Sequence, residues 1–465
     1  MRLGSQSKRA AMALFGMVAL AAPMLATAVG AQDASPMAME PNTEISGEIS
    51  VGMVANPQMV ALQELIESGA FNEAYPNITV DLTVLPENEI RQTITQDVTT
   101  QAGQFDVITI GPFEVPLWAE QGWLEEVGEE AGANAAYDLE DIFPSMTAGL
   151  TYEDGLYALP FYGESAMMFY RKDLFEAAGL EMPERPTWTQ IGEFAAQLDS
   201  EESAGICLRG LPGWGEQGAP LSTVINAFGG RWFDENWVAQ LDDEDSAAAI
   251  RFYIETLREY GPEGVEQNGF TESQTLLNQG GCAMWYDATS AAELVSDPAL
   301  NENYEQIGFA FGPSEKLVSG NWLWSWNFAM LADSDNKEAA LAFMQWATSK
   351  EYVNLIVEED GGWGRAPTGS RQSVYDDPAY QERAADFYQI VLDSINESNP
   401  NEPTEEPVPY TGGQFVRIPE FQALGNDVTQ VFAAALADDT VDIDEAIAEA
   451  NDLANQVAID AGLQE

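Results

Sequence analysis

The sequence predicts an α/β protein in two successive units, the first of which is a parallel sheet with helices on both faces. Strand-like and helix-like patterns alternate along the chain, and a β-α-β-α-β order is typical of such a sheet. The 465 residues are enough for two or more domains with cores of their own. An apolar content of 45%, arranged at regular periods, excludes a disordered chain.

The first unit follows from the spacing of its apolar residues. Residues 78–85 alternate between apolar and polar side chains, as a half-buried strand does. Residues 58–67 repeat their apolar side chains at helical spacing, directly after the break at residues 55–57. The predicted order is strand 48–54, helix 58–67, strand 78–85, helix 89–101, strand 105–110 and helix 118–126.

The stretch 155–188 connects the two units. It predicts strands at 156–161 and 166–170 around a polar turn at 162–165, followed by helices at 172–179 and 188–198. Gly179 is a stop signal for the first helix, and Thr187 is the expected N-cap of the second.

The second unit contains shorter strands and longer helices. Strands are expected at 206–210, 283–286 and 307–311, a hairpin at 231–240, and a strand at the end of the tryptophan-rich segment 319–330. Helices are expected at 219–228, 246–259, 271–278, 289–295, 337–348, 350–358, 377–396, 419–437 and 443–462. Residues 361–369 form a glycine-rich loop, and 398–409 a Pro/Glu-rich surface connection.

The first 31 residues have the three parts of a secretory signal peptide. Arg2, Lys8 and Arg9 supply the positive start, residues 10–25 the apolar run, and residues 29–31 a small-residue cleavage site. We expect cleavage after about Ala31, a flexible segment at 32–45, and a periplasmic protein. No later segment of the sequence is apolar enough to predict a membrane span.

The formal net charge is −59, from 77 acidic and 18 basic residues. Nucleic acid and anionic membranes would repel such a chain, so we expect neither as a partner. An acidic tail is excluded because the acidic residues are evenly spread, and no calcium loop of the D-x-D-x-D-G type occurs. The favoured interpretation is a halophilic protein, since salt screens self-repulsion and the hydrated acidic surface stays soluble.

Histidine is absent, and cysteine occurs only as Cys207 and Cys282. The absence of histidine removes the commonest general base and metal ligand, and two cysteines do not make a zinc site. Both cysteines begin strand-like runs, and an oxidising periplasm permits a bond between them. A disulfide and two buried free thiols both remain open.

The segment FYRKDLFEAAGLEMPERPTWTQIGEFA, residues 169–195, resembles the bacterial extracellular solute-binding proteins of sugar ABC transporters, the group that includes maltose-binding protein. A tyrosine, a basic residue, an Asp-Leu pair and an AGL run followed by proline and Thr-Trp occur in the order typical of that family. The resemblance to this family extends over essentially the whole chain after the predicted signal peptide.

This resemblance implies a fold of the type II periplasmic-binding-protein kind, with two doubly wound α/β lobes joined by a hinge. The chain of such proteins crosses the hinge three times, so lobe one is expected at 46–160 and 317–372 and lobe two at 161–316 and 373–465. The resemblance also implies no catalysis, cofactor or metal. It implies a monomer that carries a small solute to an ABC transporter permease.

Three further segments point to a subgroup. RGLPGWGEQGAPLSTVINAFGGRWFDENW (209–237), CAMWYDATS (282–290) and GGWGRAPTGSR (361–371) resemble binding proteins for linear sugar alcohols such as sorbitol and mannitol. One position differs, because Leu211 stands where that subgroup leads us to expect a basic residue. The predicted ligand is therefore a sugar alcohol or a monosaccharide, and the alternative is a disaccharide or oligosaccharide.

Ligands of doubly wound sheets bind at the carboxyl ends of the strands, so the loops after the predicted strands hold the candidate site. Aromatic, carboxylate and amide side chains gather there, and a polyhydroxylated ligand needs this mixture, because C–H faces stack on indoles and hydroxyls bond to charged groups. The candidates are Asn56, Glu114, Tyr162, Glu164, Trp214, Glu216, Asp287, Trp322, Trp324, Trp363 and Arg365.

Several candidates also have a purely structural interpretation. Trp322, Trp324 and Trp326 alternate, so they share one face of a strand that belongs either to the core or to the ligand site. Asp287 is a candidate helix cap, and Arg365 a candidate hinge ion pair. Trp118, Trp188 and Trp346 lie on predicted helices at core-like spacing, so packing is their expected role.

Two other functions compete with solute binding. Paired carboxylates among tryptophans also suit a glycoside hydrolase, which would need two carboxyl groups flanking a scissile bond. An exported structural or cation-binding surface protein would explain the charge but not the aromatic loops. Solute binding explains both the loops and the resemblance.

Overall fold

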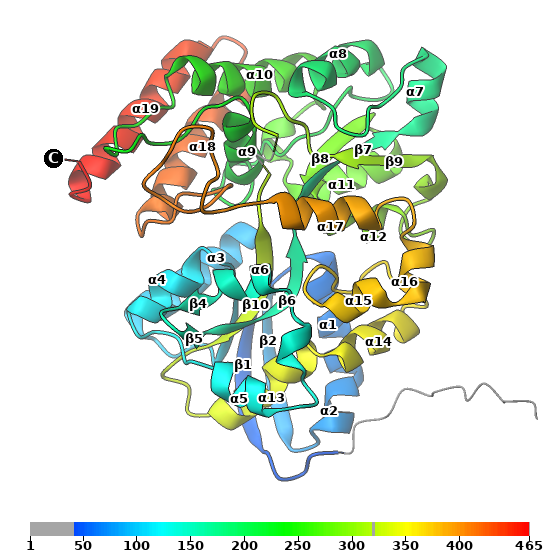
Figure 1. The fold of residues 1–465 in the computed structure, drawn as a ribbon, viewed down its shortest axis with the longest axis vertical. Helices are drawn as coiled ribbons and strands as arrows, with labels where there is room; N and C mark the ends of the chain where they lie inside the picture. Colours follow the sequence, from blue (N-terminus) through cyan, green and yellow to red (C-terminus); the bar gives the residue numbers. More distant parts are fainter. Residues whose placement is uncertain (1–40, 319–320, 465) are drawn as a thin grey trace, which may run out of the picture. The chain divides into compact units, whose positions relative to one another are not determined.

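The computed structural model describes residues 41–318 and 321–464 (Figure 1). The predicted signal peptide, residues 1–31, and most of the predicted flexible segment lie outside the described residues. Within the described ranges, no helix combines the length and the apolar character that a membrane crossing requires.

Two main sheets and one two-stranded ribbon contain the strands. The strands are β1 (Gly47–Val54), β2 (Ile78–Leu85), β3 (Val107–Ile110), β4 (Thr151–Tyr152), β5 (Gly155–Leu156), β6 (Ala158–Glu164), β7 (Ala166–Arg171), β8 (Met284–Ala288), β9 (Ile307–Phe311) and β10 (Trp324–Met330). The larger sheet has the order β2-β1-β3-β10-β6, and the smaller one the order β8-β7-β9. Figure 1 shows the larger sheet in its lower half and the smaller one in its upper half.

The larger sheet has a parallel part, as predicted. β1 pairs in parallel with both β2 and β3. β10 pairs antiparallel with β3 on one side and with β6 on the other, so β10 alone runs against the other four strands. The carboxyl ends of those four strands and the amino end of β10 therefore meet at one edge of the sheet.

The smaller sheet is antiparallel, with β7 between β8 and β9. The predicted strand at 206–210 is reduced to a single bridge between Cys207 and Trp285. The predicted turn at 162–165 was wrong, because residues 162–164 continue β6 and pair with β10. Only Ser165 separates β6 from β7, so one extended run of chain passes from the larger sheet to the smaller.

The helices fill the connections between strands. They are α1 (Pro57–Ser68), α2 (Ala70–Ala74), α3 (Glu87–Thr100), α4 (Glu114–Glu120), α5 (Gly128–Ala133), α6 (Pro144–Gly149), α7 (Lys172–Ala178), α8 (Trp188–Leu198), α9 (Gly218–Ala227), α10 (Glu244–Tyr260), α11 (Phe270–Gln279), α12 (Ala291–Val295), α13 (Lys337–Ala347), α14 (Lys350–Glu359), α15 (Gln372–Asp376), α16 (Pro378–Arg383), α17 (Tyr388–Glu397), α18 (Phe421–Ala437) and α19 (Ile443–Asp460).

Local sequence explains where the helices begin. The side chain of Asn56 accepts a bond from the Met59 amide at the start of α1, with Pro57 at the first helical position. Thr187 forms the expected N-cap of α8, and Gln190 completes a capping box by accepting a bond from the Thr187 amide.

Two predicted helices have different bounds. The helix expected at 118–126 begins at Glu114 and ends at Glu120, because Gly122 has a φ of 70° and Leu124 bridges to Leu331. The single helix expected at 377–396 is two helices, α16 and α17, because the chain leaves helical geometry between Arg383 and Tyr388.

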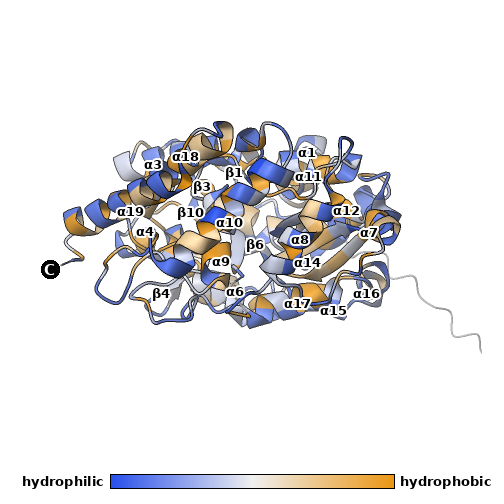
Figure 2. Ribbon diagram, turned by 90° about the horizontal axis from the view of Figure 1, so that it is seen from above, coloured by the Kyte–Doolittle hydropathy of each residue, from blue (hydrophilic) through white to orange (hydrophobic). Residues whose placement is uncertain are grey.

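The helices bury apolar faces on the sheets and on one another. α3 and α13 pack on the larger sheet, α11 and α17 on the smaller, and α9, α10, α18 and α19 pack together. The helices carry hydrophobic and hydrophilic residues on different sides, as expected for elements that cover a core (Figure 2). Trp188 and Trp346 are buried in aromatic clusters, the packing role that their helical positions predict.

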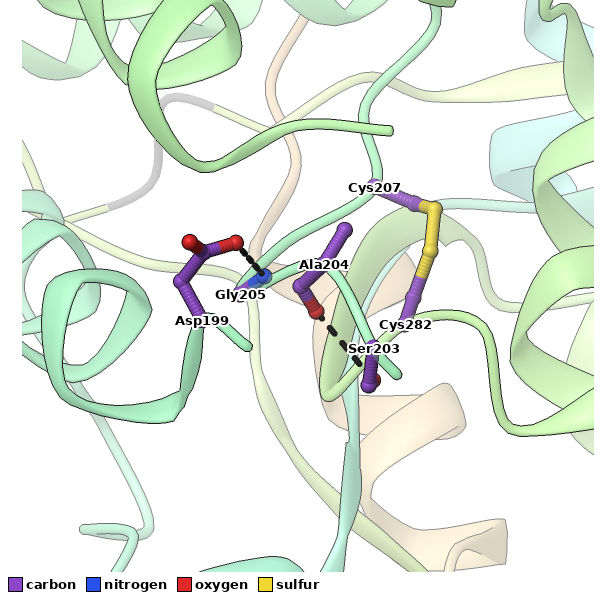
Figure 3. The surroundings of a disulfide bond; sticks show 6 residues. All are labelled: Asp199, Ser203, Ala204, Gly205, Cys207 and Cys282. Atoms are coloured by element: carbon purple, nitrogen blue, oxygen red, sulfur yellow. Dashed lines mark hydrogen bonds between the residues drawn. A yellow bond between two sulfur atoms is a disulfide. The ribbon is translucent and has the colours of Figure 1, made fainter. Parts of the chain in front are cut away.

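Cys207 and Cys282 are joined by a disulfide, with their Cα atoms 5.9 Å apart (Figure 3). Both residues are fully buried, and the Cys207 amide donates to the carbonyl of Met284 over 2.8 Å. The bond therefore holds the 206–210 segment against the start of β8.

We expect the double variant Cys207→Ala/Cys282→Ala to be less stable than the oxidised protein. The bond closes a loop with a sequence separation of 75 residues, and the chain-entropy model limits its contribution to about 4.5 kcal/mol. Urea unfolding followed by tryptophan fluorescence measures the difference. The native protein unfolded with a reductant is the control and should match the variant, whereas equal stability of the oxidised protein and the variant would contradict this role.

Candidate ligand-binding site

One pocket lies at the edge where the strand ends of the larger sheet meet. Its volume is about 910 Å³, including the part that is open to solvent. Residues that follow β1 and β2, the end of β6 and the start of β10 contribute to it. The loop at 211–216 and the start of α11 complete the lining. The pocket therefore lies at the edge where the rule for carboxyl ends of strands predicts a ligand, with β10 contributing its amino end because it runs the other way.

Seven of the eleven predicted site residues line the pocket. They are Asn56, Tyr162, Glu164, Trp214, Glu216, Trp322 and Trp324. The register of β6 and β10 explains part of this grouping, because Glu164 pairs with Trp324 and Tyr162 with Trp326, and directly opposed residues point to the same face. The three alternating tryptophans of 322–326 are buried and also form a pocket wall.

The other four predicted residues are not part of the lining. Glu114 and Asp287 are buried behind it, where each accepts a bond from an arginine that does line the pocket. The Trp363 ring packs on Tyr380, with centroids 4.9 Å apart. Arg365 forms ion pairs with Asp360 and Glu64, both at 2.7 Å, so its guanidinium links the glycine-rich loop to α1.

Arg91 on α3 is the centre of one pocket wall. Its guanidinium carbon lies 4.2 Å from the ring centroid of Trp214, 5.1 Å from that of Trp324 and 4.5 Å from that of Trp326. Contacts of this length between a guanidinium and indole faces are favourable.

Two carboxylates hold the same guanidinium. Arg91 Nη1 donates to Glu114 Oε1 over 2.8 Å, and Nε donates to Glu87 Oε1 over 2.9 Å. Burial raises the pKa of Glu114, and the charge of Arg91 opposes that rise. One face of the pocket is thus a cation clamped between carboxylates and indoles.

Arg209 is the centre of the opposite wall. Its Nε and Nη2 atoms donate to the two carboxylate oxygens of Asp287 over 2.9 and 2.6 Å, a bidentate pair. Its Nη1 donates to the carbonyl of Gly215 over 3.0 Å and lies 3.4 Å from Glu216 Oε2. Because the disulfide holds the 206–210 segment against β8, it also holds the two members of the Arg209–Asp287 pair together.

Glu164 and Glu216 are pocket carboxylates with few partners. Glu164 accepts a bond from the hydroxyl of Ser290, and burial raises its pKa to about 7. Glu216 accepts a bond from the Phe270 amide over 3.2 Å, and burial together with the charge of Glu87 raises its pKa to about 8. Both residues are more than 90% buried, so each loses hydration that a ligand hydroxyl is able to replace.

The prediction missed several lining residues. Arg91 and Arg209 were not among the predicted site residues, although basic side chains are scarce and each is a strong partner for hydroxyl groups. The resemblance led us to expect a basic residue at 211, and the structure has Arg209 two positions earlier, with Leu211 also in the lining. Other lining residues that the prediction missed include Glu87, Phe270, Thr271, Glu272, Ser290, Trp326 and Gln414.

Gly215 lets the 211–216 loop approach α3 closely. A side chain at this position would overlap Glu87 Oε1. Asn88 Nδ2 donates to the carbonyl of Pro212 over 3.1 Å, so the start of α3 directly contacts the 211–216 loop. The pocket is therefore narrow where these segments meet.

A family model for bacterial extracellular solute-binding proteins matches residues 56–354, well over half of the sequence. The chain belongs to this family. The predicted family and the predicted role in solute binding are confirmed. The family is extracellular, in agreement with the predicted export.

This solute-binding protein has close relatives. It is 46% identical over 391 residues to a mannitol-binding protein of Pseudomonas aeruginosa, a match that covers 83% of this chain and 88% of the relative. It is 28% identical over 415 residues to an erythritol/L-threitol-binding protein of Mycolicibacterium smegmatis, covering 83% of this chain and 84% of the relative.

A solved structure supports the fold. An ABC transporter solute-binding protein from Agrobacterium vitis S4, solved with bound D-mannitol, matches with a TM-score of 0.86 and 45% sequence identity. The match covers 89% of this chain and 99% of that protein. The predicted fold class, an α/β periplasmic binding protein of type II, is confirmed.

The raised pKa of Glu164 predicts a pH-dependent stability. The unfolded chain loses this proton near pH 4.5 and the folded protein near pH 7, so the free energy of unfolding falls as pH rises between these values. We expect Glu164→Gln, which stays neutral, to become more stable than the native protein across this range, by up to roughly 3 kcal/mol.

Thermal unfolding from pH 4.5 to 8 measures this difference. Glu193→Gln on α8 changes an exposed glutamate outside the lining and is the control. A Glu164→Gln stability difference that is constant with pH would contradict the assignment.

Proposed function

We propose that this protein is the substrate-binding component of an ABC importer and that it binds a linear polyol, with a hexitol such as mannitol as the first candidate. The observation that carries the proposal is the pocket, in which two guanidinium groups and several carboxylates alternate with indole faces. The mannitol-binding relative at 46% identity and the mannitol-bound neighbour at 45% support the same ligand class.

The pocket has the chemistry that a polyol requires. Each hydroxyl group of the ligand donates one hydrogen bond and accepts others. Glu164, Glu216 and Glu87 are acceptors for the donated bonds, while Arg91 and Asn56 have N–H groups to offer in return. The carbon chain of the polyol lies against the tryptophan faces, which removes its C–H surface from water.

We further propose that the chain forms the two lobes expected at 46–160 with 317–372 and at 161–316 with 373–465. The larger sheet, apart from residues 161–164 of β6, lies within lobe one and the smaller sheet within lobe two, and the extended run from β6 to β7 is one of the crossings between them. Ligand binding favours the closed arrangement in which α3 contacts the 211–216 loop, since the ligand interacts with both walls at once. A membrane permease then recognises the closed monomer.

A disaccharide or oligosaccharide is the second candidate ligand. The contact between Asn88 and Pro212 narrows the pocket and favours a short ligand over it. A glycoside hydrolase that used Glu164 and Asp287 as its carboxyl pair is disfavoured, because both oxygens of Asp287 are bound to Arg209 and neither is free to act as acid or base. Aryl glycosides incubated with the purified protein should release no product, and turnover would reject the receptor.

We also propose export by cleavage after about Ala31 and adaptation to high salt. Mass spectrometry of the secreted protein should give an N-terminus near residue 32. The net charge of −59 makes self-repulsion large at low ionic strength.

We expect the melting temperature of this chain to rise as sodium chloride increases from 0.1 to 2 M, because screening relieves the repulsion. Potassium chloride is the control for ion identity and should have a similar effect. A melting temperature that falls steadily with either salt would contradict the halophilic interpretation.

A thermal-shift screen tests the ligand class. D-Mannitol, sorbitol, ribitol and erythritol are compared with glucose, fructose and maltose in high salt. A ligand at one hundred times its dissociation constant should stabilise the protein by about 2.7 kcal/mol. No shift with any of these compounds would overturn the proposed function, and a shift with maltose alone would favour the second candidate.

Trp214→Ala should weaken polyol binding without unfolding the protein. Its indole contacts both Arg91 and Trp324, so its removal disturbs one complete wall. We expect a loss of about 2 kcal/mol, roughly thirtyfold in the dissociation constant, by isothermal titration calorimetry. Trp123→Ala, a tryptophan outside the lining, is the matched control, and equal affinity of the two variants would exclude Trp214 from the site.

A further inference from the structure

We propose that the pocket binds polyols that carry an ammonium group, such as amino alditols, more tightly than the corresponding neutral polyols, and that it rejects polyols that carry phosphate or carboxylate. This inference rests on the proposed polyol function and adds the charge of the ligand to it. The balance of charged side chains around the pocket carries it.

Carboxylates outnumber cations around the pocket. Among the described residues, those in and directly behind the lining are Glu87, Glu114, Glu164, Glu216, Glu272 and Asp287 on the acidic side and Arg91 and Arg209 on the basic side. Arg91 pairs with Glu87 and Glu114, and Arg209 pairs with Asp287 and, at 3.4 Å, with Glu216. The two guanidinium groups thus already pair with four carboxylates, and Glu164 is a further carboxylate without such a pair.

Glu164 has no cation of its own in the described part of the chain. It lines the pocket with 7% of its surface exposed, and its side chain forms no ion pair within 4.0 Å there. The hydroxyl of Ser290 donates to one of its oxygens, and no other described side chain donates to the carboxylate. A buried carboxylate in this position is stabilised by a positive charge that arrives with the ligand.

An ammonium group fits this position better than a hydroxyl. It has three donors and a full charge, so it is able to bond to Glu164 and to a second carboxylate at the same time. Tryptophan faces also attract cations, and Trp322 is a lining tryptophan over which no guanidinium of the described residues is stacked. D-Mannitol has two equivalent ends, so an amine at either end reaches Glu164 when the ligand is turned around.

The two arginines of the pocket have few unused N–H groups with which to bind an anionic ligand. Arg209 uses Nε, Nη1 and Nη2 on Asp287, Gly215 and Glu216. Arg91 uses Nε and Nη1 on Glu87 and Glu114, which leaves Nη2 as the nitrogen that forms no hydrogen bond to a described residue. A phosphate or carboxylate would displace these bonds and meet the surplus of negative charge.

The preference for an ammonium group should depend on pH. The charged groups whose fields act on Glu164 are Arg209, Asp287 and Glu87, and Ser290 is its hydrogen-bond partner. Burial raises the pKa of Glu164 to about 7 and that of Glu216 to about 8, so both carry protons at pH 5.5. The preference is then weak at pH 5.5 and stronger near pH 8.5, where both carboxyl groups are largely ionised and an alkylamine is still largely protonated.

Calorimetric titration of the full-length mature protein compares D-mannitol, 1-amino-1-deoxy-D-mannitol and mannitol 1-phosphate at pH 5.5 and 8.5. At pH 8.5 we expect the amine to bind at least tenfold more tightly than mannitol and the phosphate at least tenfold more weakly. At pH 5.5 the preference for the amine should shrink to less than threefold.

Variants identify the carboxylate. Glu164→Gln, which keeps the size and the Ser290 contact, should bind both ligands more weakly and lose most of the preference for the amine over mannitol, whereas Glu193→Gln should keep that preference. Glu216→Gln provides a second measurement if the first variant does not fold, and a smaller preference is expected there too. An unchanged preference in the folded variants would overturn the role of these carboxylates.

The outcomes separate this inference from the proposed function. If no neutral polyol binds, the proposed function fails. If mannitol binds and the amine binds equally or more weakly at pH 8.5, the charge preference is overturned and the polyol function stands. Tight binding of the phosphate would also overturn the charge preference.

Discussion

Two buried guanidinium groups are the interaction on which the site depends. Arg91 joins α3 to the buried Glu114 and to the tryptophans of β10, and Arg209 joins the 206–210 segment to Asp287 on β8. Without these cations, the pocket carboxylates would face one another in a medium of low dielectric constant, at a large cost in free energy. Arg91 and Arg209 therefore determine the shape of the pocket and lower the free-energy cost of its acidic lining.

The backbone brings these groups together through one sheet edge. Four strands end there and β10 begins there, so residues from five distant parts of the sequence become neighbours. The extended run from β6 to β7 continues from this edge into the smaller sheet. Glu164 is the last residue of β6, directly before the chain enters the smaller sheet. Because of this position, the carboxylate of Glu164 on β6 accepts a hydrogen bond from Ser290, which follows β8 of the smaller sheet.

Strong local patterns in the sequence predicted the fold well. β2 and β9 have the predicted bounds, and so does α8 with its Thr187 cap, since a clear period and a cap determine each of them locally. Residues 162–165 were misassigned because Gly163 and its polar neighbours are typical of a turn, while their pairing with β10 is a long-range contact. A strand was predicted at the end of segment 319–330, but its antiparallel place in the larger sheet was not. The pairing of β10 with β3 joins residues more than two hundred positions apart.

The site was predicted in part for the same reason. Aromatic and acidic residues after strands are visible in the sequence, and seven of the predicted residues line the pocket. The arginines were missed because their partners are 23 and 78 positions away, as Glu114 is from Arg91 and Asp287 from Arg209. Trp363 and Arg365 have the right chemistry in a glycine-rich loop, yet nothing local to that loop reveals that Tyr380 packs on Trp363 or that Glu64 pairs with Arg365.

The acidic bias of this chain acts differently at the surface and in the pocket. Surface carboxylates keep their water, so their repulsion is weak in salt and their main effect is hydration. Pocket carboxylates have lost most of that water, which is why burial raises the pKa of Glu164 and Glu216 toward neutrality. A hydroxyl-rich ligand returns hydrogen bonds to these oxygens without returning bulk solvent. The ligand hydroxyls therefore supply hydrogen bonds that these carboxylates lost when folding removed their water. These bonds stabilise the protein–ligand complex most when the pocket is closed around the ligand.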